Sequence, residues 1–165
     1  MIIRRQLLLG AASSVAIVIG SKWLGGRTVD AAAAFEIVKT DSEWRKLLTP
    51  AQYNVLRRQG TERAGSSPLD HEKRKGIFQC TGCDLPLFSS DTKFDSGTGW
   101  PSFYQPLPNA VGTSEDRSLL VLQTEVHCRR CGGHLGHVYN DGPKPTGLRY
   151  CMNGVALKFL PDKVS

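Results

Sequence analysis

Five cysteines are the residues of this 165-residue chain best suited to carry chemistry. Four of them form two C-x-x-C motifs, "CTGC" and "CRRC", which contain Cys80, Cys83, Cys128 and Cys131. A C-x-x-C turn directs both thiolates to one side, so two such turns can complete a tetrahedral site of four sulfurs. Such a site leaves no open coordination position. The two motifs therefore predict one structural Zn²⁺ per chain.

Two other interpretations of these motifs remain open at this point. Disulfide bonds are common in exported proteins, and a C-x-x-C with free thiols is typical of thiol-disulfide oxidoreductases. The glycines beside both motifs fit zinc better. A count of titratable thiols in the native protein separates zinc from the oxidoreductase interpretation, because a zinc site leaves one thiol to titrate and a free C-x-x-C leaves more.

Cys151, in "GLRYCMNG", has no cysteine left to pair with. The ordinary interpretation is a small buried residue in a strand. A nucleophilic thiol instead needs nearby donors or positive charge that favour its thiolate, and an acid if an oxygen must be protonated. The side chains near it in sequence that can supply these are His134, His137, Arg149 and Asn153.

The stretch "SGTGWPSF" presents a tryptophan in a turn. Gly97 and Gly99 predict a sharp bend, and Pro101 stiffens the chain directly after Trp100. A tryptophan in such a place is more often part of a core than of a binding site. Its face nevertheless suits a methyl group or a soft sulfur atom.

The elements that must position these residues are short strands. Apolar or alternating runs separated by Gly, Pro, Asp and Asn predict an antiparallel β domain, because no run between them is long enough for a crossover helix. The runs are "GIFQC", "LPLFSS", "KFD", "SFYQPL", "SLLVLQTEVHC", "HLGHVY", "LRYCMNG" and "VALKFL".

Two short helices are predicted before the strands. "DSEWRKLL" begins with Asp41 or Ser42 as the cap, and "TPAQYNVLRRQG" has Thr49 as N-cap, Pro50 at the first helical position and Gly60 as the stop. The polar stretch "TERAGSSPLDHEKRKG" that follows predicts a long surface loop.

Residues 1–34 predict an export signal ahead of a single domain at residues 35–165. Two arginines precede a short apolar run, and an A-x-A stretch follows it. The adjacent Arg4 and Arg5 resemble a twin-arginine signal, so we expect export to the periplasm with cleavage near Ala33 or Ala34. Retention as a membrane anchor is the alternative, although the run is shorter than the ~20 residues that span a bilayer.

Charge and composition exclude some classes of function. The chain is 40% hydrophobic and 22% charged, which is typical of a folded soluble domain. Loss of the signal would remove four basic residues and one acidic residue, and would lower the formal net charge from +6 to +3. No dense basic run is present, so we expect no nucleic-acid partner, and membrane contact only through the signal segment.

Several long stretches of the chain resemble the methionine sulfoxide reductase B family. They span nearly all of residues 48–159 in the order of the family: "LTPAQYNVLRRQGTER", "GIFQCTGCDLPLF", "KFDSGTGWPSF", "CRRCGGHLGHVYNDGP" and "GLRYCMNGVALKF". The resemblance implies a mainly β fold of two antiparallel sheets with short N-terminal helices and the zinc site. It also implies an enzyme that reduces the R epimer of methionine sulfoxide in oxidised proteins and peptides.

The resemblance further implies a role for each candidate residue. Cys151 would be the nucleophile and would become a sulfenic acid, Trp100 would hold the methyl group, and Arg149 would support the site. The residues implied to polarise and protonate the sulfoxide oxygen are His134, His137 and Asn153.

The sequence departs from the family at Thr98. Many members carry a resolving cysteine there, and zinc would occupy the other four thiols. We therefore expect an external thiol reductant, such as a thioredoxin-like protein, to attack the oxidised Cys151 directly. The alternative function is a non-catalytic zinc-containing β module that binds a protein partner.

Overall fold

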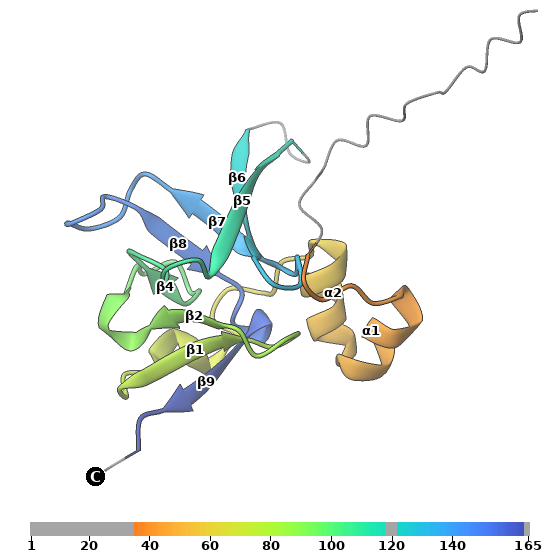
Figure 1. The fold of residues 1–165 in the computed structure, drawn as a ribbon. Helices are drawn as coiled ribbons and strands as arrows, with labels where there is room; N and C mark the ends of the chain where they lie inside the picture. Colours follow the sequence, from red (N-terminus) through yellow and green to blue (C-terminus); the bar gives the residue numbers. More distant parts are fainter. Residues whose placement is uncertain (1–34, 118–121, 164–165) are drawn as a thin grey trace, which may run out of the picture. The chain divides into compact units, whose positions relative to one another are not determined.

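The computed structural model of the protein describes residues 35–117 and 122–163 (Figure 1). The predicted export signal, with Arg4 and Arg5, lies outside these residues. The described residues belong to one compact unit, Ala33–Ser165. Within the described ranges, no helix combines the length and the apolar character that a membrane span requires.

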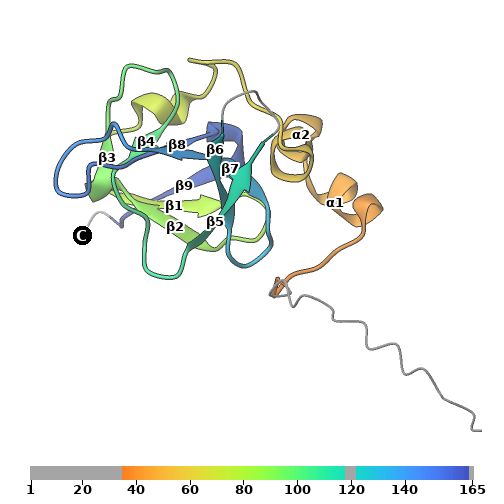
Figure 2. The ribbon, with the colours of Figure 1, turned by 90° about the horizontal axis from the view of Figure 1, so that it is seen from above.

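The strands form two antiparallel sheets, which confirms the predicted fold class. The smaller sheet has the order β2-β1-β9 and the larger has the order β3-β4-β8-β7-β6-β5. The strands are β1 (Gly76–Cys80), β2 (Pro86–Ser89), β3 (Lys93–Phe94), β4 (Ser102–Phe103), β5 (Val111–Asp116), β6 (Gln123–Cys128), β7 (His134–Tyr139), β8 (Arg149–Met152) and β9 (Leu157–Pro161). Both ribbon views place the two helices at the end of the sheets opposite β3 and β4 (Figures 1 and 2).

Strand β5 is absent from the predicted runs. Its sequence, "VGTSED", has no apolar alternation, and most of its side chains are exposed or half-buried. The strand lies at the edge of the larger sheet and pairs only with β6. Backbone hydrogen bonds to one neighbour, rather than burial of an apolar face, therefore hold it in the sheet.

The two helices begin with capping boxes. Helix α1 (Asp41–Leu47) is capped by Thr40 and not by the predicted Asp41 or Ser42, because Thr40 and Glu43 exchange side-chain and backbone hydrogen bonds. Helix α2 (Pro50–Arg58) has the predicted N-cap Thr49, with proline in its first turn.

The end of α2 differs from the prediction in its detail. Gln59, not Gly60, takes the left-handed conformation, with φ 55°. A Cβ at Gly60 would lie only 2.2 Å from the side-chain nitrogen of Asn54. Gly60 follows this cap and lies directly against Asn54, where little space is left for a side chain. The predicted loop after it contains a short 3₁₀ helix, η1 (Pro68–His71), and two further 3₁₀ turns follow at η2 (Ser90–Thr92) and η3 (Gly154–Ala156).

An aromatic cluster packs the two sheets together. Phe88 of β2 stacks on Phe103 of β4 with ring centroids 4.4 Å apart, and Phe78 of β1 meets Phe103 edge-on at 4.9 Å. All three side chains are fully buried. This aromatic cluster fixes β4, which lies beside the strand that carries Cys151.

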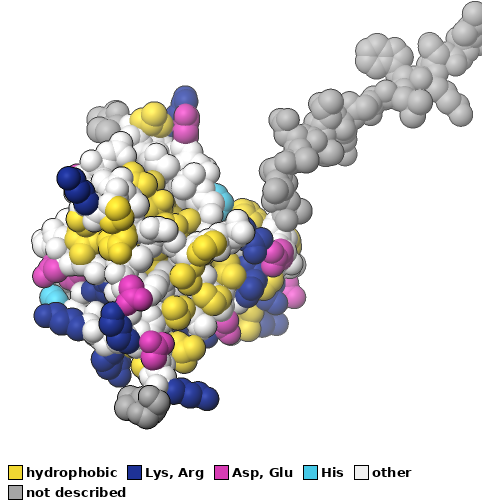
Figure 3. Space-filling view, turned by 60° about the vertical axis from the view of Figure 1, so that its left-hand side comes forward, with side chains coloured by type: hydrophobic (Ala, Val, Ile, Leu, Met, Phe, Trp, Pro, Cys, Tyr) yellow, Lys and Arg dark blue, Asp and Glu magenta, His cyan; other side chains and the backbone are white. Residues whose placement is uncertain are grey.

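On the molecular face seen in Figure 3, hydrophobic side chains gather centrally, with acidic and basic side chains interspersed around them.

Candidate active site and metal centre

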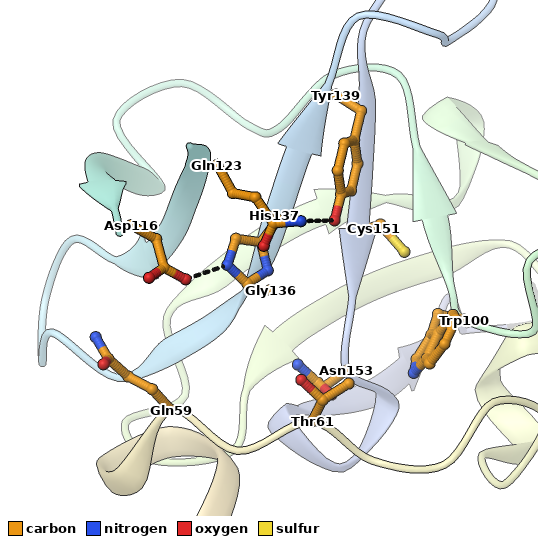
Figure 4. A pocket seen from close by; sticks show the side chains of 10 residues that line it. All are labelled: Gln59, Thr61, Trp100, Asp116, Gln123, Gly136, His137, Tyr139, Cys151 and Asn153. Atoms are coloured by element: carbon orange, nitrogen blue, oxygen red, sulfur yellow. Dashed lines mark hydrogen bonds and ion pairs between the residues drawn. The ribbon is translucent and has the colours of Figure 1, made fainter. Parts of the chain in front are cut away.

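Cys151 lies on an inner strand of the larger sheet. Its register partners are Ser102 on β4 and His137 on β7. It opens into a pocket of about 310 Å³ (Figure 4). The pocket is lined by Gln59, Thr61, Trp100, Asp116, Gln123, Gly136, His137, Tyr139, Cys151 and Asn153.

The structure brings together most of the predicted site residues. The pocket is lined by Cys151, His137, Asn153 and Trp100, whereas His134 and Arg149 are not among its lining residues. Six lining residues were not predicted from sequence: Gln59, Thr61, Asp116, Gln123, Gly136 and Tyr139. Only Tyr139 carried a usable signal, because it lies two residues after His137 on the same strand.

The environment of the Cys151 thiol contains opposing influences. Burial raises its pKa, while the hydroxyl of Thr98, the positive charge of Arg149 and the hydroxyl of Ser102 act to lower it. The oxygen of Thr98 lies 3.9 Å from the sulfur. The thiolate needed for nucleophilic attack thus depends on these donors.

Arg149 is held in place by a carboxylate that sequence reasoning missed. Its Nε and terminal nitrogen donate to both oxygens of Asp141, at 2.9 and 2.8 Å, and this pairing lowers the pKa of Asp141. The guanidinium lies 4.5 Å from the ring centre of Tyr139. A bidentate ion pair and a stacked ring orient a cation beside Cys151.

His137 pairs with an acid from the unpredicted edge strand. Its Nε2 lies 2.8 Å from Oδ2 of Asp116, at the end of β5. The carboxylate orients the imidazole ring in the pocket. Across the pocket, Gln123 donates to the hydroxyl of Tyr139 at 3.3 Å (Figure 4).

His134 lies behind His137 and does not line the pocket. It is only 2% exposed, and its Nδ1 is 2.7 Å from Oε1 of Glu125. Burial lowers the pKa of His134, which favours the neutral ring. Its Nε2 has no hydrogen-bond partner among the described residues, and its ring meets that of His137 edge-on at 5.3 Å.

A β-bulge brings the two histidines together. Residues three apart on a regular strand point to opposite faces. Between β6 and β7 the register shifts, so that His134 and Gly136 face adjacent residues of β6, and the extra residue restores a common side. Gly136 also has a packing role, because a Cβ there would lie 2.1 Å from the backbone oxygen of Cys151.

The four remaining cysteines form a separate cluster. Their sulfurs all lie within 4.8 Å of one another, with Cys80 to Cys131 at 3.8 Å and Cys83 to Cys128 at 3.5 Å. A tetrahedral Zn²⁺ with bonds of about 2.3 Å requires sulfurs roughly 3.8 Å apart. Four thiolates this close also repel one another without a cation. The cluster therefore fits a metal ion held by four sulfurs.

The two C-x-x-C turns have the same backbone form. The residue after each motif, Asp84 or Gly132, is left-handed, with φ 61° and 66°. Its N–H donates to the carbonyl of the first cysteine of its motif at 2.9 Å in both cases. Cys80 ends β1 and Cys128 ends β6. The cluster consequently joins the smaller sheet to the larger one.

Comparison with known proteins agrees with this architecture. The SelR domain matches residues 48–161. The peptide methionine sulfoxide reductase MsrB of Agrobacterium fabrum is 51% identical over 127 residues, which cover 76% of this chain and 94% of that protein. The protein of the same name from Leptospira interrogans is 53% identical, with 78% of this chain and 98% of that protein covered. The one from Methanosarcina barkeri is 55% identical, with 77% of this chain and 90% of that protein covered.

The chain belongs to the methionine sulfoxide reductase B family. Membership in this family supports methionine sulfoxide reductase activity. The pocket around Cys151 is then the candidate active site of the reductase.

Glu62 connects both walls of this reductase pocket, and sequence reasoning did not predict it. Its carbonyl accepts from the indole N–H of Trp100 at 3.2 Å, and its N–H donates to Oδ1 of Asn153 at 2.9 Å. Its carboxylate accepts from the backbone N–H groups of Gly154 and Val155, at 2.6 and 3.0 Å. Glu62 thus holds the start of η3, where Asn153 lies.

Replacement of Glu62 by alanine is expected to destabilise the reductase by about 2–4 kcal/mol, because two partly buried N–H groups lose their acceptors. Urea unfolding measures this change. Glu115→Ala is the matched control, since Glu115 is an exposed strand residue that forms an ion pair with the exposed Arg117. An unfolding midpoint for Glu62→Ala equal to that of the control would contradict the role of Glu62.

Proposed function

We propose that this protein reduces the R epimer of methionine sulfoxide in oxidised proteins, with Cys151 as the nucleophile. The observation that carries the proposal is the position of Cys151. Its sulfur lies in a pocket between His137 and Trp100, apart from the four clustered cysteines. A pocket with a thiol, a proton donor and an apolar wall contains the three groups that the reaction needs.

The proposed reaction begins with attack of the Cys151 thiolate on the sulfoxide sulfur. His137, oriented by Asp116, gives a proton to the sulfoxide oxygen; its other ring nitrogen lies on the side away from Asp116 (Figure 4). The sulfur–oxygen bond of the substrate breaks, and oxygen passes to Cys151. The products are methionine and a Cys151 sulfenic acid.

Selection of one epimer follows from the two walls of the pocket. The ring of Trp100 is fixed by its bond to Glu62 and suits the methyl group. The polar wall carries His137 and Tyr139 and suits the oxygen. Only one configuration at sulfur satisfies both walls once the peptide chain leaves the pocket in a fixed direction.

Turnover of N-blocked methionine R-sulfoxide and S-sulfoxide, measured separately with dithiothreitol, tests this function. We expect reduction of the R epimer only. Equal turnover of both epimers would contradict the selection by Trp100 and His137. No turnover of either by folded, metal-loaded protein would favour the alternative, a non-catalytic β module that binds a protein partner.

We also propose that an external thiol, such as that of a thioredoxin-like protein, reduces the sulfenic acid and releases water. Thr98 occupies the position of the family's resolving cysteine and lies 3.9 Å from the Cys151 sulfur. A threonine cannot form a disulfide. Oxidised Cys151 then has only thiols from outside its pocket to react with.

Thr98→Cys is expected to convert this cycle to one with an internal disulfide, because the new sulfur would lie next to Cys151. Exposure to substrate without reductant should add one oxygen to the intact mass of the native protein. The variant should instead lose two hydrogens. An oxygen adduct in both proteins would show that position 98 cannot reach the oxidised sulfur.

The cluster of four sulfurs is proposed to hold one structural Zn²⁺, which supplies cross-linking rather than chemistry because all four positions are taken. Export to the periplasm is proposed for residues 1–34 on the basis of sequence alone. Replacement of both Arg4 and Arg5 by lysine, followed by cell fractionation, tests the twin-arginine route. Unchanged export of that variant would exclude it.

A further inference from the structure

Three hydroxyl groups connect the sulfur of Cys151 to a backbone carbonyl. The oxygen of Thr98 lies 3.9 Å from the sulfur and 2.8 Å from the oxygen of Ser96. The oxygen of Ser96 lies 2.7 Å from that of Ser102. Ser102 donates to the carbonyl of Trp100 at 3.0 Å. The order along this chain is therefore Cys151, Thr98, Ser96, Ser102 and the Trp100 carbonyl.

The direction in which the hydroxyls of this chain donate depends on the charge of Cys151. Each hydroxyl carries one hydrogen. With a neutral thiol, every hydrogen can point away from the sulfur: the thiol donates to Thr98, Thr98 to Ser96, Ser96 to Ser102 and Ser102 to the carbonyl. With a thiolate, Thr98 must turn toward the sulfur, and Ser96 and Ser102 can turn after it. The direction of the chain thus follows the ionisation of the nucleophile.

The three hydroxyls are carried by a constrained backbone turn and are partly or fully shielded from solvent. Ser102 is fully buried, while Ser96 and Thr98 are half-buried. The turn that carries them contains two left-handed glycines, Gly97 and Gly99, with φ 69° and 86°. A Cβ at Gly99 would lie 2.8 Å from the backbone nitrogen of a neighbouring loop. Water has restricted access to replace a missing hydroxyl.

The charged and titratable groups around Cys151 approach its sulfur from other sides than the three hydroxyls do. Arg149, paired with Asp141, and Tyr139 flank the sulfur along the sheet. His137, paired with Asp116, faces it from β7. The side toward β4 presents the hydroxyls of Thr98 and Ser102 to the sulfur, and burial of Cys151 raises its pKa in opposition to these donors.

We propose that Thr98, Ser96 and Ser102 form a hydrogen-bond relay that stabilises the Cys151 thiolate. The inference rests on the proposed function only in taking Cys151 to be the nucleophile. Thr98 and Ser102 contact the reacting sulfur, while Ser96 is a positioning residue that acts through them. Thr98, which stands in place of a resolving cysteine, thereby serves to activate the nucleophile Cys151.

The pH dependence of Cys151 alkylation in the full-length protein tests the relay. Iodoacetamide reacts with the thiolate, and peptide mapping separates Cys151 from the clustered cysteines. We expect the midpoint to rise by about one pH unit in Thr98→Val, which removes a donor to the thiolate, and by about half a unit in Ser96→Ala, which removes the hydroxyl that orients this donor. Thr98→Ser, which keeps the hydroxyl, and Thr113→Val, on an exposed strand position, should match the native midpoint.

An unchanged midpoint in folded Ser96→Ala would overturn the relay, since Ser96 does not touch the sulfur. An unchanged midpoint in Thr98→Val would overturn it as well. Should Thr98→Val fold poorly, Ser96→Ala decides alone, because it removes one half-buried oxygen and nothing else. Alkylation requires no substrate, so the result is distinguishable from a failure of the proposed reductase activity.

Discussion

Replacement of Cys151 by serine is expected to abolish methionine sulfoxide reduction, with a loss of at least about 10³-fold in kcat. A serine hydroxyl fits the space of the thiol but does not ionise near neutral pH, so the nucleophile is lost. The rate of R-sulfoxide reduction with dithiothreitol measures the effect.

The same variant supplies its own structural controls. Cys151 lies outside the cluster of four sulfurs, so the metal content and the urea unfolding midpoint should equal those of the native protein. Residual activity within tenfold of the native value would place the nucleophile elsewhere. Loss of metal from this variant would show that Cys151 is not independent of the cluster.

Loss of the metal is expected to have the largest effect on stability, with a decrease of more than about 3 kcal/mol in the free energy of unfolding. The reason is topological: Cys80 and Cys83 follow β1 of the smaller sheet, while Cys128 and Cys131 follow β6 of the larger. Cys128→Ser removes one ligand, and urea unfolding with elemental analysis measures stability and bound zinc together.

A matched pair of variants separates the two roles of cysteine. Cys128→Ser should lose zinc and stability, whereas Cys151→Ser should lose only activity. Full stability of the native protein after treatment with a strong chelator, once elemental analysis shows the zinc to be gone, would refute the structural role of the ion. Two disulfides in place of zinc would appear as a single titratable thiol after chelation.

Local sequence determined the elements that depend on neighbouring residues. Thr49 and Pro50 begin α2 where the sequence placed them, because a cap needs only residues within one turn. Local signals failed by a residue at α1, where Thr40 rather than Asp41 is the cap. They failed entirely for β5, which has no apolar face to bury.

The cluster of four cysteines was predictable because its members come in pairs. Each C-x-x-C turn is a local structure, and two of them in one chain imply a common site even though they lie on different sheets. Cys151, His137, Asn153 and Trp100, which line the pocket, were predicted as site residues because they lie in distinctive stretches near sequence neighbours of suitable chemistry.

By itself, the sequence identified the candidates for chemistry: the four sulfurs of the cluster, the lone thiol and the stretches that resemble the reductase family. The tertiary structure alone decided how that chemistry is supported. A bulge breaks the regular period of a strand and brings His134 beside His137. The hydrogen bonds of Asp116 and Glu62 join residues that lie far apart in the chain. Such contacts depend on strand register, which is a property of paired strands and not of either strand alone.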